Sequence, residues 1–311
     1  ANMKIGFAGD VFLGGDLLNT NCVDLVSSKI FNSAEYRIIN LEQPISNNNY
    51  VADKGTLYTD SAALNKLKDL KIDAVNIANN HIHDKGLNGI HETVEHLSSI
   101  DIDSFGAGKN ISISAKPLFI TDRIAILGYC DFDKPYLKKV VAADSSSPGV
   151  NPLRLEKIKS DLDKLPAEVK AIIYFHWGME HVWLPRKEDI NIAKELLEDS
   201  RIITVIGMHA HRIQGVINHA GKKAYMCLGN FIFPNFYIKP PMQLSYPNKE
   251  ELEKCRHQTR QYHKVYKLTL KKWRWVNRVS LVLDFCSETF ELNHNFVIHD
   301  DNSSVIRDLK E

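Results

Sequence analysis

Residues 202–211 read Ile-Ile-Thr-Val-Ile-Gly-Met-His-Ala-His, an apolar run that ends in two alternating histidines. The run 202–206 has the length and the β-branched composition of a buried strand. Alternation along an extended segment puts the imidazoles of His209 and His211 on the same side. This stretch therefore predicts a buried strand that carries metal ligands at its carboxyl end.

Apolar runs alternate with helical patterns from the first residues to about residue 230, which predicts an α/β fold with largely parallel strands. In residues 87–98, apolar side chains at spacings of three and four predict a helix with one buried face. The predicted strands are 3–8, 36–41, 74–78, 169–175 and 202–206, with hairpins over 116–129 and 216–228; the predicted helices are 61–70, 87–98, 153–165 and 187–198.

Four other predicted strands also end in residues that can bind a metal. These residues are Asp10, Glu42, Asn80 with His81, and His176. Ligand sites in open α/β sheets gather at the carboxyl ends of strands, so we expect these side chains to converge. Carboxylate, amide and imidazole without thiolate favour Mn, Fe, Zn or Mg ions in a reactive site over a structural zinc site. One carboxylate could bridge two ions, which predicts metal-assisted hydrolysis.

Each of these motifs also has a purely structural interpretation. Gly9-Asp10 after a strand is commonly a turn, Asn40 and Glu42 could cap the turn at Pro44, and Trp177 could form a packed aromatic corner. Among the 13 histidines, His83 and His181 are as compatible with a supporting role as with the surface, whereas His91 and His96 suit the surface. The ordered combination favours the functional interpretation.

The composition indicates the cellular compartment and the classes of molecule that the protein can bind. The chain has 311 residues, 44% hydrophobic residues and a net charge of +1, so no overall field favours nucleic acid or an anionic membrane. Five scattered cysteines without a CxxC pair favour a reducing compartment. No run approaches the roughly 18 apolar residues of a membrane span. We expect a natural start at Met3 and a cytoplasmic protein, or an exported one if a leader has been removed.

The composition changes after residue 236, so we expect a main domain over 1–236 and a C-terminal segment over 237–311. This segment is predicted to contain a polar helix at 248–263 and paired strands at 279–285 and 290–297, which complete the sandwich as a β extension. Basic and aromatic residues alternate over 264–278. They could hold an anionic polymer, although a solvated basic face of a strand pair is the simpler interpretation.

Seven motifs in order resemble the CapA family of bacterial capsule synthesis proteins, which is associated with poly-γ-glutamate. The resemblance covers residues 3–233. The motifs are Gly9-Asp10, Asn40-Leu41-Glu42-Gln43-Pro44, Ala78-Asn79-Asn80-His81 with Asp84-Lys85-Gly86, Gly106-Ala107-Gly108, His176-Trp177-Gly178, Gly207-Met208-His209-Ala210-His211, and Leu228-Gly229-Asn230-Phe231.

That family is similar to the calcineurin-like metallophosphoesterases, so the resemblance implies a four-layer αββα sandwich with a dinuclear metal site. It implies Asp10, Glu42, Asn80, His176, His209 and His211 as ligands, with Glu42 as the bridge. It further implies that His81 is the catalytic acid or the donor to a developing oxyanion. Asn40, His83, Trp177 and Asn230 are expected to support the ligands or to contact substrate.

The sequence departs from the phosphoesterase pattern on the first strand. An Asp-x-His pair is expected there, but the chain has Asp10-Val11-Phe12, so one imidazole ligand is absent. The proline common in the last histidine motif of the capsule family is replaced by Ala210, which changes loop stiffness.

Two hypotheses for function remain open. The first is a metallohydrolase that cleaves a phosphoester, or an amide of a glutamyl polymer or cell-envelope precursor, in capsule metabolism. The second is a non-catalytic capsule-assembly or polymer-binding factor, because a fold does not fix the chemistry. Under either hypothesis the expected partners are an anionic polymer or phosphoester substrate and other capsule-biosynthesis proteins.

Overall fold

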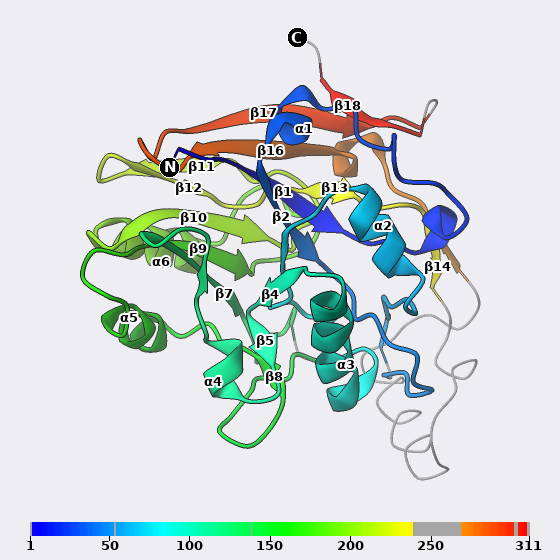
Figure 1. Cartoon of the computed structure of the whole chain (residues 1–311), viewed down its shortest axis with the longest axis horizontal. Coiled ribbons are helices and arrows are strands. Elements are labelled where there is room, and N and C mark those ends of the chain that lie inside the picture. The colour runs from blue at the N-terminus through cyan, green and yellow to red at the C-terminus, as the bar shows by residue number, and fades with distance from the viewer. Residues whose placement is uncertain (1, 53, 138, 239–268, 302–303, 310–311) are drawn as a thin grey trace.

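A computed structural model describes residues 2–52, 54–137, 139–238, 269–301 and 304–309. Two β-sheets pack face to face, and helices cover their outer faces (Figure 1). The predicted four-layer αββα sandwich is therefore confirmed. The layers are held by three apolar clusters, one between the sheets and one under each layer of helices.

The first sheet has the strand order β18-β17-β16-β1-β2-β3-β4, with β13 also beside β1. Strands β1 to β4 are parallel, whereas β16, β17 and β18 pair in antiparallel fashion. The bounds are β1 (Lys4–Val11), β2 (Tyr36–Leu41), β3 (Ala74–Asn76), β4 (Asp103–Phe105), β13 (Asn230–Ile232), β16 (Val279–Cys286), β17 (Leu292–His299) and β18 (Ile306–Asp308). The C-terminal strands thus extend the sheet that contains the N-terminal strand.

The second sheet has the order β11-β12-β10-β9-β7-β6. Its central strands are parallel, and its two edge strands are antiparallel. The bounds are β6 (Leu118–Phe119), β7 (Ile124–Cys130), β9 (Lys170–His176), β10 (Ile202–Met208), β11 (Val216–His219) and β12 (Lys222–Tyr225). Two small pairs lie outside the sheets: β5 (Ala107–Gly108) with β8 (Gly149–Val150), and β14 (Phe236–Ile238) with β15 (Thr269–Lys271).

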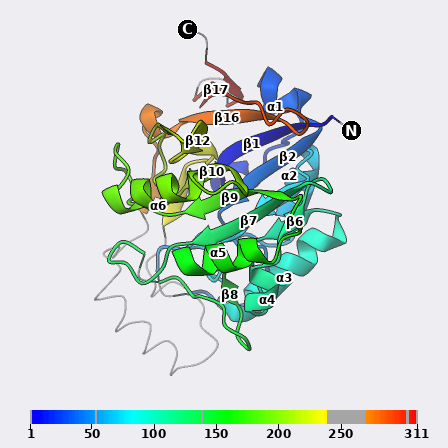
Figure 2. The ribbon, with the colours of Figure 1, turned by 90° about the vertical axis from the view of Figure 1, so that its left-hand side faces the viewer.

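Helices cover each sheet because their apolar faces match those of the strands. The first sheet packs against α1 (Lys29–Ser33), α2 (Ala63–Asp69) and α3 (Gly86–Ser99). The second packs against α5 (Leu155–Asp163) and α6 (Lys187–Leu197), which lie over its strands in Figure 2. The short α4 (Ile111–Ser114) precedes β6, and 3₁₀ turns occur at Gly15–Leu17 and Trp275–Asn277.

Most predicted elements are present, and the differences lie at ends and in short strands. Both hairpins are confirmed, and at Ala220-Gly221 the positive φ angles of 52° and 72° suit the turn of a two-residue hairpin. The first strand reaches Val11, so Asp10 lies inside it and not after it. The predicted helix 248–263 lies outside the described residues. The domain boundary at residue 236 stays a prediction.

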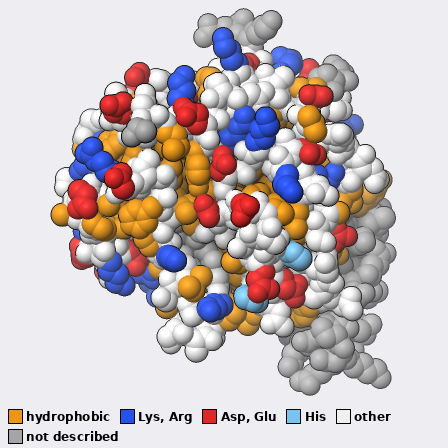
Figure 3. Space-filling model, in the orientation of Figure 1, with side chains coloured by type: hydrophobic (Ala, Val, Ile, Leu, Met, Phe, Trp, Pro, Cys, Tyr) orange, Lys and Arg blue, Asp and Glu red, His pale blue; other side chains and the backbone are white. Residues whose placement is uncertain are grey.

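The surface carries no dominant charge on the face shown in Figure 3, where acidic and basic side chains are interspersed. Cys22, Cys130, Cys227 and Cys286 are free thiols. Among the residues that the structure describes, no helix combines the length and the apolar character needed to cross a membrane.

Candidate metal centre

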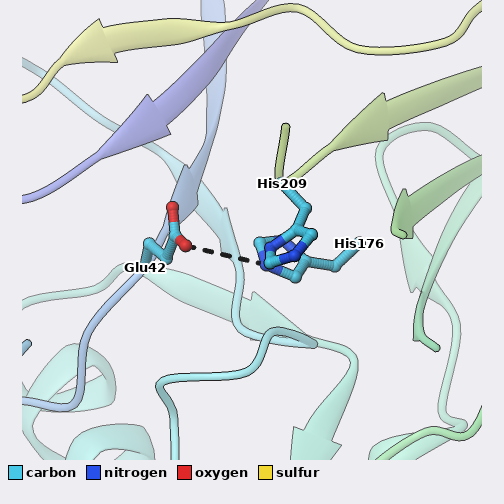
Figure 4. Close-up of side chains that lie close together, drawn as sticks. All are labelled: Glu42, His176 and His209. Atoms are coloured by element: carbon cyan, nitrogen blue, oxygen red, sulfur yellow. Dashed lines mark hydrogen bonds and ion pairs between the residues drawn. The ribbon is translucent and has the colours of Figure 1, made fainter. Parts of the chain in front are cut away.

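The candidate ligands meet at the carboxyl ends of strands from both sheets. Asp10 lies near the end of β1, Glu42 follows β2, and His176 ends β9. The loop after β10 supplies His209 and His211. In Figure 4 the side chains of Glu42, His176 and His209 point toward one another from separate strands. Two groups have ligand atoms within 4.8 Å of one another: Asp10, Glu42 and His211, and Glu42, His176 and His209.

The distances within these groups suit two neighbouring ions. Ligands of one transition-metal ion lie roughly 3–4 Å apart, because each metal–ligand bond is about 2.0–2.2 Å. Glu42 Oε1 is 3.7 Å from His176 Nε2 and 3.7 Å from His211 Nε2. His176 Nε2 also lies 3.0 Å from His209 Nδ1 and 2.9 Å from Asn80 Oδ1. Asp10 Oδ2 lies 3.5 Å from the other ring nitrogen of His211, Nδ1. Both groups share Glu42.

The two histidines after β10 reach the site in a different way from the one expected. The strand ends at Met208, and the following residues form bends. His209 has φ of 103° and His211 has φ of 60°, so the segment is not extended. The segment is therefore bent, and not extended as predicted, although both imidazoles reach the same cluster. Backbone strain in non-glycine residues is found most often at functional sites, where the surrounding structure compensates for it.

Asparagine side chains orient the ligands. Asn40 Nδ2 donates to Asp10 Oδ1 at 2.6 Å and lies 3.4 Å from His176 Nδ1. Asn76 Nδ2 in turn donates to Asn40 Oδ1 at 3.0 Å. The imidazole of His211 donates from Nδ1 to Asn230 Oδ1 at 2.8 Å, which leaves Nε2 as the ligand atom.

The close approach of backbones explains how Asn230 reaches the site. β1 and β13 pair in parallel with Asp10 opposite Asn230. A Cβ atom on Gly9 would lie 2.0 Å from the carbonyl oxygen of Gly229, so any larger residue would push the two segments apart.

The donor set fits divalent cations. Asp10 Oδ2, both carboxylate oxygens of Glu42, and His209 Nε2 are buried without a hydrogen-bond partner. Burial raises the pKa of Asp10 to about 6, although the neighbouring His211 opposes the shift. Burial, with the charge of Asp10, raises the pKa of Glu42 well above its usual value. Buried carboxylates without partners are costly, and a bound cation would compensate them.

The imidazoles of His176 and His209 are poor bases in the protein. Burial lowers the pKa of His209 to about 3 despite the opposing charge of Glu180, and burial also lowers the pKa of His176. Neutral imidazole is the form that binds a metal, so these shifts favour ligation.

A second cluster lies beside the ligands and involves His81. His81 Nδ1 donates to Asp84 Oδ2 at 2.6 Å, and Asp84 Oδ1 pairs with Lys54 Nζ at 2.8 Å. Burial raises the pKa of Asp84, but Lys54 and His81 outweigh it and lower the pKa to about 2. Asp84 therefore stays ionised and fixes the ring of His81.

The cluster opens into a pocket of about 310 Å³. Basic and aromatic side chains stand beside the acids and histidines at its wall; the lining includes Lys54, Asn80, His81, Glu180, His181, His211, Phe233, Phe236, Lys271 and Trp273. A larger hollow of about 690 Å³ lies at the amino ends of β9, β10 and β12, lined by Lys170, Ile202 and Lys222 among others. We place the site at the smaller pocket because the candidate ligands Asn80 and His211 line it together with His81.

Not every residue predicted for the site reaches it. The indole of Trp177 packs against Phe175 with ring centroids 4.5 Å apart and donates to the carbonyl of Met226 at 3.0 Å, within the core beneath the helices. Successive residues along an extended chain point to opposite faces, so Trp177 faces away from the partners of His176. His83 is buried, and its Nδ1 atom has no hydrogen-bond partner.

Sequence reasoning assigned no role to three charged residues at the site, although Asp84 belongs to a quoted motif. Lys54 and Asp84 support His81, and Glu180 Oε1 lies 3.8 Å from His211 Nε2. Asp84 and Glu180 follow recognised histidines by three and four positions, a spacing that could have drawn attention to them. Nothing in the local sequence around Lys54 marks it.

Comparisons with known proteins agree with the resemblance. The chain is 27% identical over 246 residues to a Bacillus subtilis (strain 168) protein named PGA biosynthesis protein CapA, with 74% of this chain and 63% of that one covered. It is 26% identical over 252 residues to the capsule biosynthesis protein CapA of Bacillus anthracis, with 74% and 60% covered. The chain thus spans less than two thirds of the length of these relatives.

A solved structure from Thermus thermophilus, that of the protein TT1561, aligns with 10% identity and a TM-score of 0.41 over 88% of this chain and 100% of that chain. The assignment of the fold rests on the layer packing described above. The sequence profile of the family described as "Bacterial capsule synthesis protein PGA_cap" matches residues 4–235. This match includes every strand that carries a candidate ligand, and the chain therefore belongs to the PGA_cap family of bacterial capsule synthesis proteins.

Proposed function

We propose that this protein is a hydrolase dependent on two divalent metal ions, and that it cleaves a phosphoester or an amide in the metabolism of capsule, poly-γ-glutamate or another cell-envelope polymer. The observation that carries the proposal is the pair of ligand groups that share the buried Glu42. The names of the relatives, which refer to capsule and polymer synthesis, support the pathway.

The ligands have separate tasks in this proposal. Asp10, Glu42 and His211 would hold one ion, and Glu42, Asn80, His176 and His209 would hold the other. When bound, the ions would polarise the scissile group and activate water for attack. The asparagines keep the carboxylate and imidazole ligands in position before substrate arrives.

His81 would transfer the proton that the leaving group needs. Burial lowers the pKa of His81, although Asp84 opposes the shift, which supports a neutral ring at rest. Because Nδ1 donates to Asp84, the other ring nitrogen is left as the acceptor. The ring would accept a proton from the attacking water at its free nitrogen, would be stabilised by Asp84 while protonated, and would pass the proton to the leaving group. This resting state refines the expected role of His81 as an acid.

The pocket wall supports an anionic substrate. Lys54 and Lys271 line it, and the indole of Trp273 lies 4.7 Å beneath the Lys271 ammonium and is buried with Phe233. An anionic group could be held by the lysines while its apolar chain packs on the aromatic rings. The basic and aromatic pattern predicted from residue 264 onward is described here only from residue 269.

The test combines metal analysis with a panel of phosphomonoester, phosphodiester and γ-glutamyl amide substrates under Mn²⁺, Fe²⁺, Zn²⁺ and Mg²⁺. We expect about two ions per chain, and activity on one class that is lost in Glu42→Gln and His81→Ala. His91→Ala is the matched control, because this ring is 53% exposed on α3. Absence of stoichiometric metal would refute the proposal. Metal binding without activity on any class would favour the polymer-binding alternative.

A further inference from the structure

Glu180 stands at the mouth of the candidate metal centre and faces two of its imidazoles. Its Oε1 atom is 3.8 Å from His211 Nε2 and 4.0 Å from His209 Nε2. The side chain is 42% exposed, whereas the imidazole of His209 is fully buried and His209 Nε2 lacks a hydrogen-bond partner. Glu180 therefore lies between the buried cluster and the pocket, and its side chain lines that pocket.

The metal position at Asp10 is short of one ligand. Its group contains two carboxylates and one imidazole. Phe12, where an imidazole is expected, has its ring buried against Phe233 and Phe236, with centroids 5.7 Å and 5.5 Å away. Zinc sites in proteins are mostly four-coordinate, and Mn or Mg sites take more ligands. A further donor is therefore needed from elsewhere in the chain or from solvent.

The orientation of His211 shows where that donor can come from. Its Nδ1 atom is used by Asn230, so the lone pair of Nε2 points to the remaining neighbours. These are Glu42 Oε1 at 3.7 Å and Glu180 Oε1 at 3.8 Å. Both distances lie within the roughly 3–4 Å expected between ligands of one ion. Glu180 stands outside the group of Asp10, Glu42 and His211, whose ligand atoms all lie within 4.8 Å of one another, so its partly exposed side chain would have to rotate toward the carboxylates to share their ion.

We propose that the carboxylate of Glu180 is a ligand of the ion held by Asp10, Glu42 and His211, and that it takes the place of the imidazole absent at position 12. This inference rests on the proposed function, because it requires two metal positions. Glu180 approaches from the loop after β9, so the substituted ligand comes from the second sheet and not from β1.

The alternative is that Glu180 only forms an ion pair with a protonated histidine. The two cases predict different numbers of bound metal ions for a variant whose side chain at position 180 carries no charge. In Glu180→Gln the anionic ligand is replaced by a neutral amide oxygen, which binds a cation less tightly, and the ion at the Asp10 position becomes weakly held. An ion-pair partner can be replaced by Gln without a change in the number of bound ions.

The experiment measures metal binding by the purified full chain after chelation and desalting. Mn²⁺ is titrated by calorimetry, the bound metal is counted by elemental analysis, and paramagnetic resonance detects the spin-coupled Mn pair. We expect two ions in the wild type, and in Glu180→Gln a second ion that binds at least about tenfold more weakly, with loss of the coupled signal. Glu188→Gln is the control, since this carboxylate is 66% exposed and pairs with Arg186. Circular dichroism confirms that each variant folds.

A rescue variant sharpens the test. Phe12→His in the Glu180→Gln background puts an imidazole directly after β1 and is expected to restore the second ion. Two ions with unchanged affinity in Glu180→Gln would overturn this inference and leave the proposed function intact. A single ion in the wild type would overturn both this inference and the two-metal form of the proposed function. A wild type without stoichiometric metal would refute the proposed function as well, so the two failures are distinguishable.

Discussion

Asp10→Asn should stabilise the metal-free protein while abolishing one metal position. Asp10 is completely buried, and its Oδ2 atom has no hydrogen-bond partner. Burial raises its pKa from 3.8 to about 6, which corresponds to roughly 3 kcal/mol of lost stability at neutral pH. Asparagine at position 10 removes the carboxylate charge and keeps a side-chain oxygen that can accept the hydrogen bond from Asn40.

The sign of the pH dependence follows from proton linkage. The unfolded chain releases the Asp10 proton near pH 3.8, but the folded chain keeps it to about pH 6. Between these values the folded state binds more protons, so raising the pH lowers the free energy of unfolding. The stability advantage of Asp10→Asn over the wild type should therefore grow by roughly 2 kcal/mol between about pH 4.5 and pH 7.5.

Urea unfolding with a chelator measures this advantage, and Asp24→Asn, at an exposed carboxylate, controls for the substitution itself. Added Mn²⁺ should reverse the order once its concentration reaches about one thousand times its Kd, because it then stabilises the wild type by about 4.1 kcal/mol. The variant should gain less. An advantage that stays constant across the pH range, or a variant less stable than the wild type in chelator at pH 7.5, would refute the reasoning.

Three further changes test other parts of the structure. Asp84→Asn leaves Lys54, which is 11% exposed, without its counter-charge. It should lower the free energy of unfolding, measured with urea at neutral pH, by roughly 3–5 kcal/mol. A loss below about 1 kcal/mol is the level of a surface ion pair and would show that this pair is solvated. Gly9→Ala puts a Cβ 2.0 Å from the Gly229 carbonyl and should weaken metal binding measured by calorimetry, whereas unchanged affinity would mean that β13 does not position the site. Leu197→Ala removes a side chain from the fully buried core under α6 and should lower the free energy of unfolding, measured by heat or urea, by about 2–5 kcal/mol. The number of bound metal ions should stay unchanged. A loss of metal would contradict the separation of this core from the metal site.

The sequence predicted the central strands well and the short ones poorly. The apolar run at β10 and the alternating elements around it follow from local patterns of burial, which a sequence displays directly. β4 and β13 have three residues each, too few for a periodic pattern. β13 forms because it pairs with β1 across more than 200 positions, a contact that no local pattern records.

The sequence pattern alone predicted an α/β class with largely parallel strands and a set of candidate ligands at strand ends, because the carboxyl ends of parallel strands gather at one edge of a sheet. The four-layer αββα arrangement was implied by the resemblance to the CapA family. The tertiary structure decided which of those side chains approach one another and that Glu42 belongs to both groups. It also brought Asp84 to His81 and Glu180 to His211, and turned His209 and His211 inward through positive φ angles. These arrangements depend on distances between segments remote in sequence, and such distances exist only once the two sheets have packed.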